Sequence, residues 1–266
     1  MKKLSFTTMA TPGLGAVESI KAARRYGYAG VDLRVSDYLG EITLNSTARE
    51  ISDIRSAFLS EGIQVSGLLC YNEQGGKEEG SWSKMKESIS RHLEIANMLG
   101  SPAIRIFGGN PGDFKIHRDF IERTAEVISE VLQTASSGVC ILVQNHSNSF
   151  TAPEIVQLVE MVGSPELGMA FCPEHSFIMK DDMAGTLPSM KGIIHQLYIA
   201  DVIRVGNDYR SVLPGRGSVP VADVYQALGG SSFEGWVTFK WEKIWNKTLE
   251  EPEIALPHFI EYFNNL

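Results

Sequence analysis

Short apolar runs rich in β-branched residues alternate with stretches of helical spacing along the chain, and this alternation restricts the fold more than any other feature. It is typical of α/β folds in which helices connect parallel strands. Eight such strands within 266 residues favour a closed (β/α)8 TIM barrel over an open doubly wound sheet, and no linker divides residues 1–266 into domains. The expected strands are 4–8, 30–35, 64–71, 103–107, 140–146, 167–172, 194–200 and 235–245.

The segments between these strands predict helices. Asn45 or Ser46 is expected to cap the second helix, because short polar side chains accept hydrogen bonds from free N–H groups at helix starts. The clearest helix follows residue 109 and presents an apolar face that we expect to pack on the core. That face consists of Ile121, Ala125, Ile128 and Leu132. The other expected helices are 16–26, one ending near 59, one ending at 100, 153–162, 221–228 and one from 252 or 257 to 263.

Charge and cysteine content limit the classes of partner and compartment. The formal net charge is −8 and the isoelectric point is about 5.3, which argues against binding to a nucleic-acid backbone or a membrane surface. Small anionic ligands stay compatible with this charge. The cysteines are Cys70, Cys140 and Cys172, an odd number without a Cys-x-x-Cys pair, as is usual in a reducing compartment. We therefore expect a cytoplasmic protein with no nucleic-acid or membrane partner; a homo-oligomer is also compatible with the sequence.

Parity within the strands predicts which side chains point into the barrel. In the second strand, Asp32 and Arg34 share the face opposite the aliphatic residues, and Arg105, Gln144 and His146 oppose aliphatic residues in later strands. Because helices cover the outside of such a barrel, the aliphatic faces should point outward. Polar groups are therefore expected to converge at the C-terminal mouth, where barrel enzymes have their active sites.

The last expected strand delivers two charges to one face. Thr238, Lys240 and Glu242 alternate with the aromatic residues of 235–245. Lys and Glu are rarely buried unless they are paired. This face is therefore either exposed to water or part of a site.

Several short motifs follow one another in a fairly specific order and spacing. They are Gly-Tyr-Ala-Gly-Val-Asp-Leu-Arg at 27–34, Ile-Arg-Ile-Phe-Gly-Gly at 104–109, Gln-Asn-His at 144–146, Cys-Pro-Glu-His at 172–175, Asp201, Pro-Gly-Arg-Gly at 214–217 and Phe-Lys-Trp-Glu-Lys at 239–243. Together they resemble the xylose isomerase-like barrels that include sugar phosphate isomerases and epimerases, over nearly the whole chain. The resemblance implies one divalent metal at the mouth, such as Mn, Mg, Co or Zn, held by Glu, Asp, His and Glu from strands five to eight. It also implies that the two glutamates move protons beside a carbonyl while the metal stabilises the enediolate.

All four metal-ligand positions implied by the resemblance are substituted. Gln144, Cys172, Tyr198 and Lys240 stand where Glu, Asp, His and Glu are expected. With a neutral thiol and phenol, the charge of the set changes from −3 to +1, which leaves no carboxylate cage and places an ammonium at the site. Cys172 with His175 is two ligands short of a four-coordinate site. We expect neither the metal nor another cofactor.

Lys240 admits three interpretations. It is an ion-paired structural residue balanced by Glu242 or Glu174, or it binds an anionic group of a ligand with help from Arg34 or Arg105. In the third, a lowered pKa makes it a general base or a Schiff-base lysine.

Other site residues also have a functional and a structural interpretation. Arg34 and Arg105 are expected to pair with Asp32 inside the barrel. Cys172 is either a buried apolar residue or a thiolate beside His175. Tyr198 either donates a hydrogen bond or fills space. The Gly-Arg-Gly around Arg216 is expected to be a turn after the seventh strand, with a weaker alternative as a phosphate loop.

Two functions follow from these residues. In the first, the protein is a sugar or sugar phosphate isomerase or epimerase that works without the usual metal. In the second, it is a non-catalytic relative that binds a small carbohydrate or anion; a zinc endonuclease is disfavoured by the acidic charge. The sequence leaves catalysis open. The expected catalytic residues are His175, Glu242, Lys240 and Glu174, and the expected substrate-binding residues are Arg34, Arg105, Gln144, His146, Cys172, Tyr198, Asp201 and Arg216.

Overall fold

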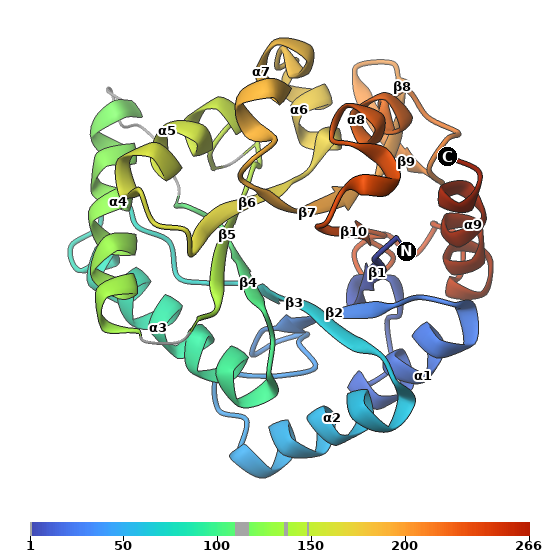
Figure 1. The fold of residues 1–266 in the computed structure, drawn as a ribbon, viewed down its shortest axis with the longest axis horizontal. Coiled ribbons are helices and arrows are strands. Elements are labelled where there is room, and N and C mark those ends of the chain that lie inside the picture. The colour runs from blue at the N-terminus through green and yellow to red at the C-terminus, as the bar shows by residue number, and fades with distance from the viewer. Residues whose placement is uncertain (1, 110–116, 136–137, 148) are drawn as a thin grey trace.

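The strands close into one parallel barrel in a computed structural model that describes residues 2–109, 117–135, 138–147 and 149–266 (Figure 1). The barrel strands are β1 (Leu4–Thr7), β2 (Gly30–Val35), β3 (Gln64–Cys70), β4 (Ala103–Ile106), β5 (Cys140–Gln144), β6 (Leu167–Phe171), β7 (Ile194–Ile199) and β10 (Trp236–Phe239). Their order around the barrel is β1-β10-β7-β6-β5-β4-β3-β2. The predicted α/β class and (β/α)8 architecture are confirmed.

The last barrel strand ends earlier than the sequence predicts. Lys240 still donates its N–H to the Ile199 carbonyl at 2.8 Å, but Trp245 and Asn246 both donate back to the Glu242 carbonyl at 3.0 Å. The prediction of a strand over 235–245 is therefore wrong beyond β10, because these backbone groups bond locally instead of to a neighbouring strand. The shorter strand leaves Lys240 and Glu242 in the segment that forms the mouth.

Helices surround the barrel, as Figure 1 shows. They include α1 (Ala16–Tyr26), α2 (Ala48–Glu61), α3 (Ser81–Leu99), α4 (His117–Thr134), α5 (Ala152–Val162), α8 (Val221–Ala227) and α9 (Pro252–Asn264). The N-cap of α2 is Thr47, so the prediction of Asn45 or Ser46 is wrong. Thr47 accepts from the Glu50 N–H at 3.2 Å while the Glu50 carboxylate accepts from the Thr47 N–H at 2.7 Å. This reciprocal pair satisfies two free donors at the helix start and places the N-cap at Thr47.

Two separate apolar clusters bear out the strand parity. The outer cluster lies between strands and helices and includes Val31, Leu33 and Val35, as well as the apolar face of α4. The inner cluster fills the barrel and consists of Met9, Leu69, Ala103, Leu142, Ala170, Cys172 and Tyr198. Barrel strands contact helices on their outer face and the side chains of other strands on their inner face. Both faces are therefore apolar, except where inward polar side chains bond to one another.

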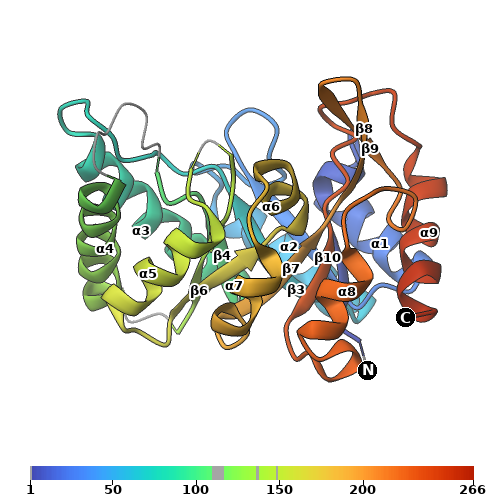
Figure 2. The same ribbon diagram turned by 90° about the horizontal axis from the view of Figure 1, so that it is seen from above.

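Three elements between β6 and α8 are absent from the sequence prediction. They are α6 (Pro173–Met179), α7 (Met183–Met190) and an antiparallel hairpin of β8 (Asp201–Val205) and β9 (Asp208–Val212). The hairpin rises at the end of the barrel opposite the N-terminus (Figure 2). Its residues are largely exposed or half-buried, so they lack the apolar signal that marks the barrel strands. Within the described ranges, none of the helices combines the length and apolar character needed to traverse a bilayer.

Candidate functional site

An arc of stacked side chains lines part of the C-terminal mouth. The guanidinium of Arg105 lies 4.3 Å from the ring centre of Phe107 and 5.5 Å from that of Tyr71. The Phe107 ring meets His146 at 5.0 Å, and His146 meets His175 at 4.2 Å between ring centres. These five residues, which we call the aromatic arc, follow or end strands β3 to β6. The mouth predicted from parity is thus assembled from neighbouring strands.

Lys240 lies between two carboxylates. Its Nζ is 2.6 Å from Glu242 Oε1 and 3.4 Å from Glu174 Oε2. Burial by itself lowers the pKa of Lys240, but the two carboxylates outweigh it, so the pKa lies above its ordinary value. The prediction of an ion-paired lysine is confirmed, and the alternative of a lysine with a lowered pKa is wrong.

The two carboxyl groups beside Lys240 differ in protonation. The ammonium lowers the pKa of Glu242, whose side chain is partly open to solvent. Burial raises the pKa of Glu174, against the opposing effect of Lys240. At neutral pH Glu242 is therefore the stronger candidate for a base, and Glu174 is the one that holds a proton more readily.

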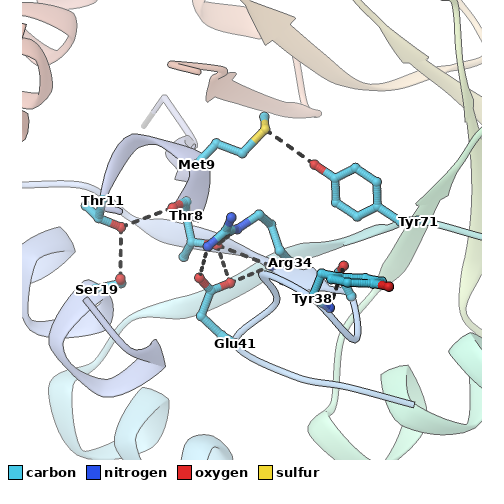
Figure 3. Close-up of polar contacts among 9 residues, drawn as sticks. Thr8, Met9, Thr11, Ser19, Arg34, Tyr38, Glu41 and Tyr71 are labelled. Carbon is cyan, nitrogen blue, oxygen red and sulfur yellow. Dashed lines mark hydrogen bonds and ion pairs between the residues drawn. The ribbon is translucent and has the colours of Figure 1, made fainter. Parts of the chain in front are cut away.

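Arg34 pairs with Glu41 (Figure 3), and the ion pairs of the described residues include none between Arg34 and Asp32. Glu41 Oε1 accepts from Arg34 Nη2 at 2.5 Å, and Oε2 accepts from the Arg34 backbone N–H at 3.0 Å and from the Thr8 hydroxyl at 2.5 Å. Glu41 reaches this position through a tight turn at Gly40, where an added Cβ would lie 2.3 Å from the Ser36 nitrogen. The predicted pairing of Arg34 with Asp32 is wrong because the loop after β2 supplies a carboxylate aimed at the guanidinium.

Met9 links the aromatic arc to the segment that carries Lys240. The Tyr71 hydroxyl donates to Met9 Sδ at 3.6 Å (Figure 3), and the Ile244 N–H donates to the Met9 carbonyl at 3.1 Å. With His175 next to Glu174 in α6, these contacts complete a ring around the mouth. Its walls combine cations, carboxylates and flat apolar faces, the groups that bind hydroxylated ligands.

Asp32 lies deeper in the barrel and is bound by neutral donors. Its Oδ2 accepts from the Tyr198 hydroxyl at 2.5 Å and from Gln196 Nε2 at 2.9 Å. No ion pair joins it to Arg105 in the part of the chain that the structure describes, so that predicted pair is also wrong. Burial raises the pKa of Asp32 to about 6, although Tyr198 and Arg105 oppose this rise.

Replacing Asp32 by Asn is expected to stabilise the protein at pH 7.5 by as much as about 3 kcal/mol. Because the folded pKa lies above the ordinary 3.8, the stabilising contribution of Asp32 is complete below pH 4 and lost as the pH rises through 6. Asn keeps an acceptor for Tyr198 and Gln196 but carries no charge. Urea unfolding at pH 4.5 and 7.5 measures the effect, with the exposed Asp53→Asn as control. A variant less stable than wild type at pH 7.5 would contradict it.

The thiol and the imidazoles at the mouth are neutral. Burial raises the pKa of Cys172 to about 12, so the thiolate alternative is wrong at physiological pH. Burial, with Lys240 nearby, lowers the pKa of His146 to about 4 and that of His175 well below its ordinary value. His175 Nε2 is buried without a hydrogen-bond partner. It is therefore free to accept or donate a hydrogen bond to a ligand.

Among the described residues, one group of potential metal ligands stands close together. Cys172, Glu174 and His175 place one ligand atom each within 4.8 Å of one another. The Lys240 ammonium contacts the same Glu174 carboxylate, so this carboxylate already has a positive counter-charge without a metal ion.

Two asparagines hold strand ends at the mouth. Asn72 accepts from the Phe107 N–H at 2.9 Å and donates to the Phe107 carbonyl at 3.0 Å. Asn145 does the same for Cys172, at 2.7 and 3.0 Å. Each side-chain amide thus continues the ladder between neighbouring strands past the point where the strands end, and fixes the backbone of a mouth residue.

Asp201 and Arg216 belong to the hairpin and the loop that follows it. The Asp201 carboxylate accepts four backbone N–H bonds of 2.8 to 3.0 Å, from Val202, Gly215, Gly217 and Val219. An added Cβ at Gly217 would lie 2.0 Å from Asp201 Oδ1, which explains the second glycine of the Gly-Arg-Gly sequence. These glycines form a loop organised by Asp201 after the hairpin, and Arg216 is exposed on it. Their substrate-binding role stays a prediction.

Sequence reasoning missed several contributors to the mouth. They are Thr8, Met9, Glu41, Tyr71, Asn72 and Phe107. All but Glu41 lie at or just beyond the C-terminal end of a predicted strand, and that position was a usable signal.

The family model for xylose isomerase-like TIM barrels matches residues 20–259 of the chain. The chain belongs to this family. No curated protein matches it. In this xylose isomerase-like barrel, Gln144 ends β5, Tyr198 is next to the last residue of β7, and Cys172 and Lys240 directly follow β6 and β10, so these four residues lie toward one mouth.

Solved structures similar to this xylose isomerase-like barrel are sugar epimerases and related proteins. The IOLI protein with a bound zinc atom is 15% identical, with a TM-score of 0.81, over 99% of this chain and 97% of that chain. D-psicose 3-epimerase with D-tagatose, from Clostridium cellulolyticum, is 16% identical, with a TM-score of 0.78, over 99% and 98%. The 3-keto-D-glucoside 4-epimerase of E. coli is 14% identical, with a TM-score of 0.74, over the whole of both chains. At such identities these likenesses show the fold.

Proposed function

We propose that the protein is a sugar or sugar phosphate isomerase- or epimerase-like protein that acts on or binds a small polyhydroxy or anionic carbohydrate at the mouth of the barrel, without a divalent metal. The observation that carries this proposal is the Lys240 ammonium between Glu242 and Glu174, whose pKa values are displaced in opposite directions. Of two carboxyl groups tuned apart in this way, the ionised Glu242 is suited to act as a base beside an ammonium that stabilises negative charge. Sugar epimerases among the structural neighbours support the same class.

In the proposed reaction, the Glu242 carboxylate removes a proton from the carbon next to the substrate carbonyl. The electron pair of the broken C–H bond forms the C=C bond of an enediolate, and the π pair of the C=O bond moves to the former carbonyl oxygen. Return of a proton to carbon completes isomerisation or epimerisation. The Lys240 ammonium and His175 Nε2 supply charge and a hydrogen bond toward the oxygen on which negative charge develops.

The groups at the family's metal-ligand positions do not fit a hard divalent cation. Gln144 offers only an amide oxygen, the Cys172 thiol has a pKa of about 12, and the Tyr198 hydroxyl is bonded to Asp32. Lys240 brings a positive charge to the same place. This chemistry supports a site without metal, and the free cysteines support our placement of the protein in the cytoplasm.

A second candidate is a non-catalytic protein that binds the same class of ligand. It is favoured by the ion pairs that tie Glu242 and Glu174 to the Lys240 ammonium, because the ammonium lowers the pKa of Glu242 and so makes its carboxylate a weaker base. In this case the ring around the mouth serves recognition alone.

The test is deuterium exchange in D2O, followed by NMR, with ketose and aldose sugars and their phosphates, using protein treated with EDTA. We expect incorporation at the carbon beside the carbonyl, reduced about 100-fold or more by Glu242→Gln, because that change removes the base. Glu253→Gln, on the exposed face of α9, is the matched control. Exchange that persists in Glu242→Gln, or that requires added Mn²⁺ or Mg²⁺, contradicts the proposal. Binding without exchange by wild type supports the second candidate.

A further inference from the structure

Arg105 is a buried cation held by contacts that do not neutralise it. Its residue is 3% exposed and points into the barrel from β4. The Phe107 and Tyr71 rings contact the guanidinium, and Nη1 donates to the Cys70 carbonyl at 3.2 Å. Nε is buried and has no hydrogen-bond partner. The group is therefore fixed in place while part of its bonding capacity stays open.

The other two cations of the mouth differ from Arg105 in their partners. Arg34 has Glu41 at 2.5 Å, and Lys240 has Glu242 and Glu174. No carboxylate lies within ion-pair distance of Arg105 in the described parts of the chain. Burial raises the pKa of Asp32, deeper in the barrel, against the opposing charge of Arg105, but its hydrogen bonds come from Tyr198 and Gln196. Burying a charge without a counter-charge is costly, so an unpaired guanidinium at a mouth points to an anion that binds there.

Gln144 provides a second open donor on the neighbouring strand. Arg105 is in register with Leu142, and Gln144 follows Leu142 by two positions on the same inward face, one step nearer the mouth. Both its amide nitrogen and its amide oxygen are buried and without partners. The Arg105 guanidinium, which gives one N–H to the Cys70 carbonyl, and the Gln144 amide are both planar, and their N–H groups match the two oxygens of a planar carboxylate.

We propose that the ligand of this barrel carries a carboxylate, and that Arg105 binds it with Gln144 as second donor. This inference rests on the proposed function, because it takes the mouth as the ligand site, and it narrows the ligand class to sugar acids. Arg34 and Lys240 have carboxylates of the protein as counter-charges, whereas Arg105 has no ion-pair partner among the described residues.

Calorimetric titration tests the proposal with D-glucuronate, D-galacturonate and D-gluconate, against D-glucose and D-galactose as neutral controls and D-glucose 6-phosphate as a phosphate probe. At least one sugar acid is expected to bind wild type about tenfold or more tightly than the neutral sugars, because a charge-assisted hydrogen bond is gained. Arg105→Met is expected to abolish this difference and Arg105→Lys to retain part of it. The exposed Arg123→Met on α4 is the control and should leave it unchanged.

A second readout needs no ligand. Because Arg105→Met removes an unpaired buried charge, it is expected to raise the thermal midpoint of the ligand-free protein by about 2–4 °C. A lowered midpoint would mean that the protein itself satisfies the guanidinium, and would overturn the inference. Failure of every sugar acid to bind wild type, or tighter binding of the phosphate probe, would also overturn it. Neutral sugars that exchange deuterium without any preference for acids would refute the inference and leave the proposed function standing.

Discussion

Replacing Lys240 by methionine is expected to lower the free energy of unfolding by about 3 kcal/mol at pH 8, because it leaves the buried Glu174 carboxylate without its counter-charge. Urea unfolding measures the change. Lys86→Met is the control, since Lys86 and Glu130 form an exposed pair whose loss should not shift the midpoint. An equally stable Lys240→Met variant at pH 8 would show that the ammonium is not the counter-charge of this site.

The loss caused by Lys240→Met should depend on pH and on metal. Without the ammonium, burial raises the pKa of Glu174 further, so its stabilising contribution is present at low pH and lost as the pH rises. The deficit should therefore shrink toward pH 5. Zn²⁺ is expected to raise the midpoint of the variant through Cys172, Glu174 and His175, and to leave wild type unchanged. Stoichiometric Zn²⁺ in wild type would overturn our proposal of a site without metal.

Arg34→Met is expected to cost about 3–5 kcal/mol, because it strands the Glu41 carboxylate, whose side chain is 3% exposed. Unlike Arg105→Met, which removes an unpaired charge, this change breaks a pair, so the two arginine variants should shift stability in opposite directions. Urea unfolding of both at pH 7.5 gives the comparison.

The double variant Arg34→Met with Glu41→Gln separates the loss of the pair from the loss of packing. The introduced glutamine keeps an oxygen that accepts from the Thr8 hydroxyl and leaves no buried charge. Much of the stability lost in Arg34→Met should return. If the double variant is less stable than the single one, the Glu41 carboxylate stabilises the fold through contacts other than its ion pair with Arg34.

The barrel was predictable because the alternation of strand and helix patterns repeats along the whole chain. Each strand repeats the same parity, and Asp32 and Arg34 point inward for the same reason that Arg105 does. A misplaced strand end does not change this result. The charged face of Lys240 was predictable on the same grounds, since the side-chain period continues for at least one residue beyond β10.

Partners and loops were harder to predict because they depend on geometry outside the strands. Glu41 is seven residues from Arg34, and only the turn at Gly40 brings it to the guanidinium. The sequence predicts a substrate-binding role for Asp201, but its carboxylate oxygens accept hydrogen bonds from the backbone of its own loop. Residue type and order alone do not distinguish these arrangements.

The asparagine amides at Phe107 and Cys172 have an evolutionary consequence. They tie the rim of the barrel through groups that are separate from the side chains of Gln144, Cys172, Tyr198 and Lys240. A lineage can therefore exchange reactive residues one after another while the wall that carries them keeps its shape. Ancestral reconstructions that retain Asn72 and Asn145 would be the place to look for such exchanges.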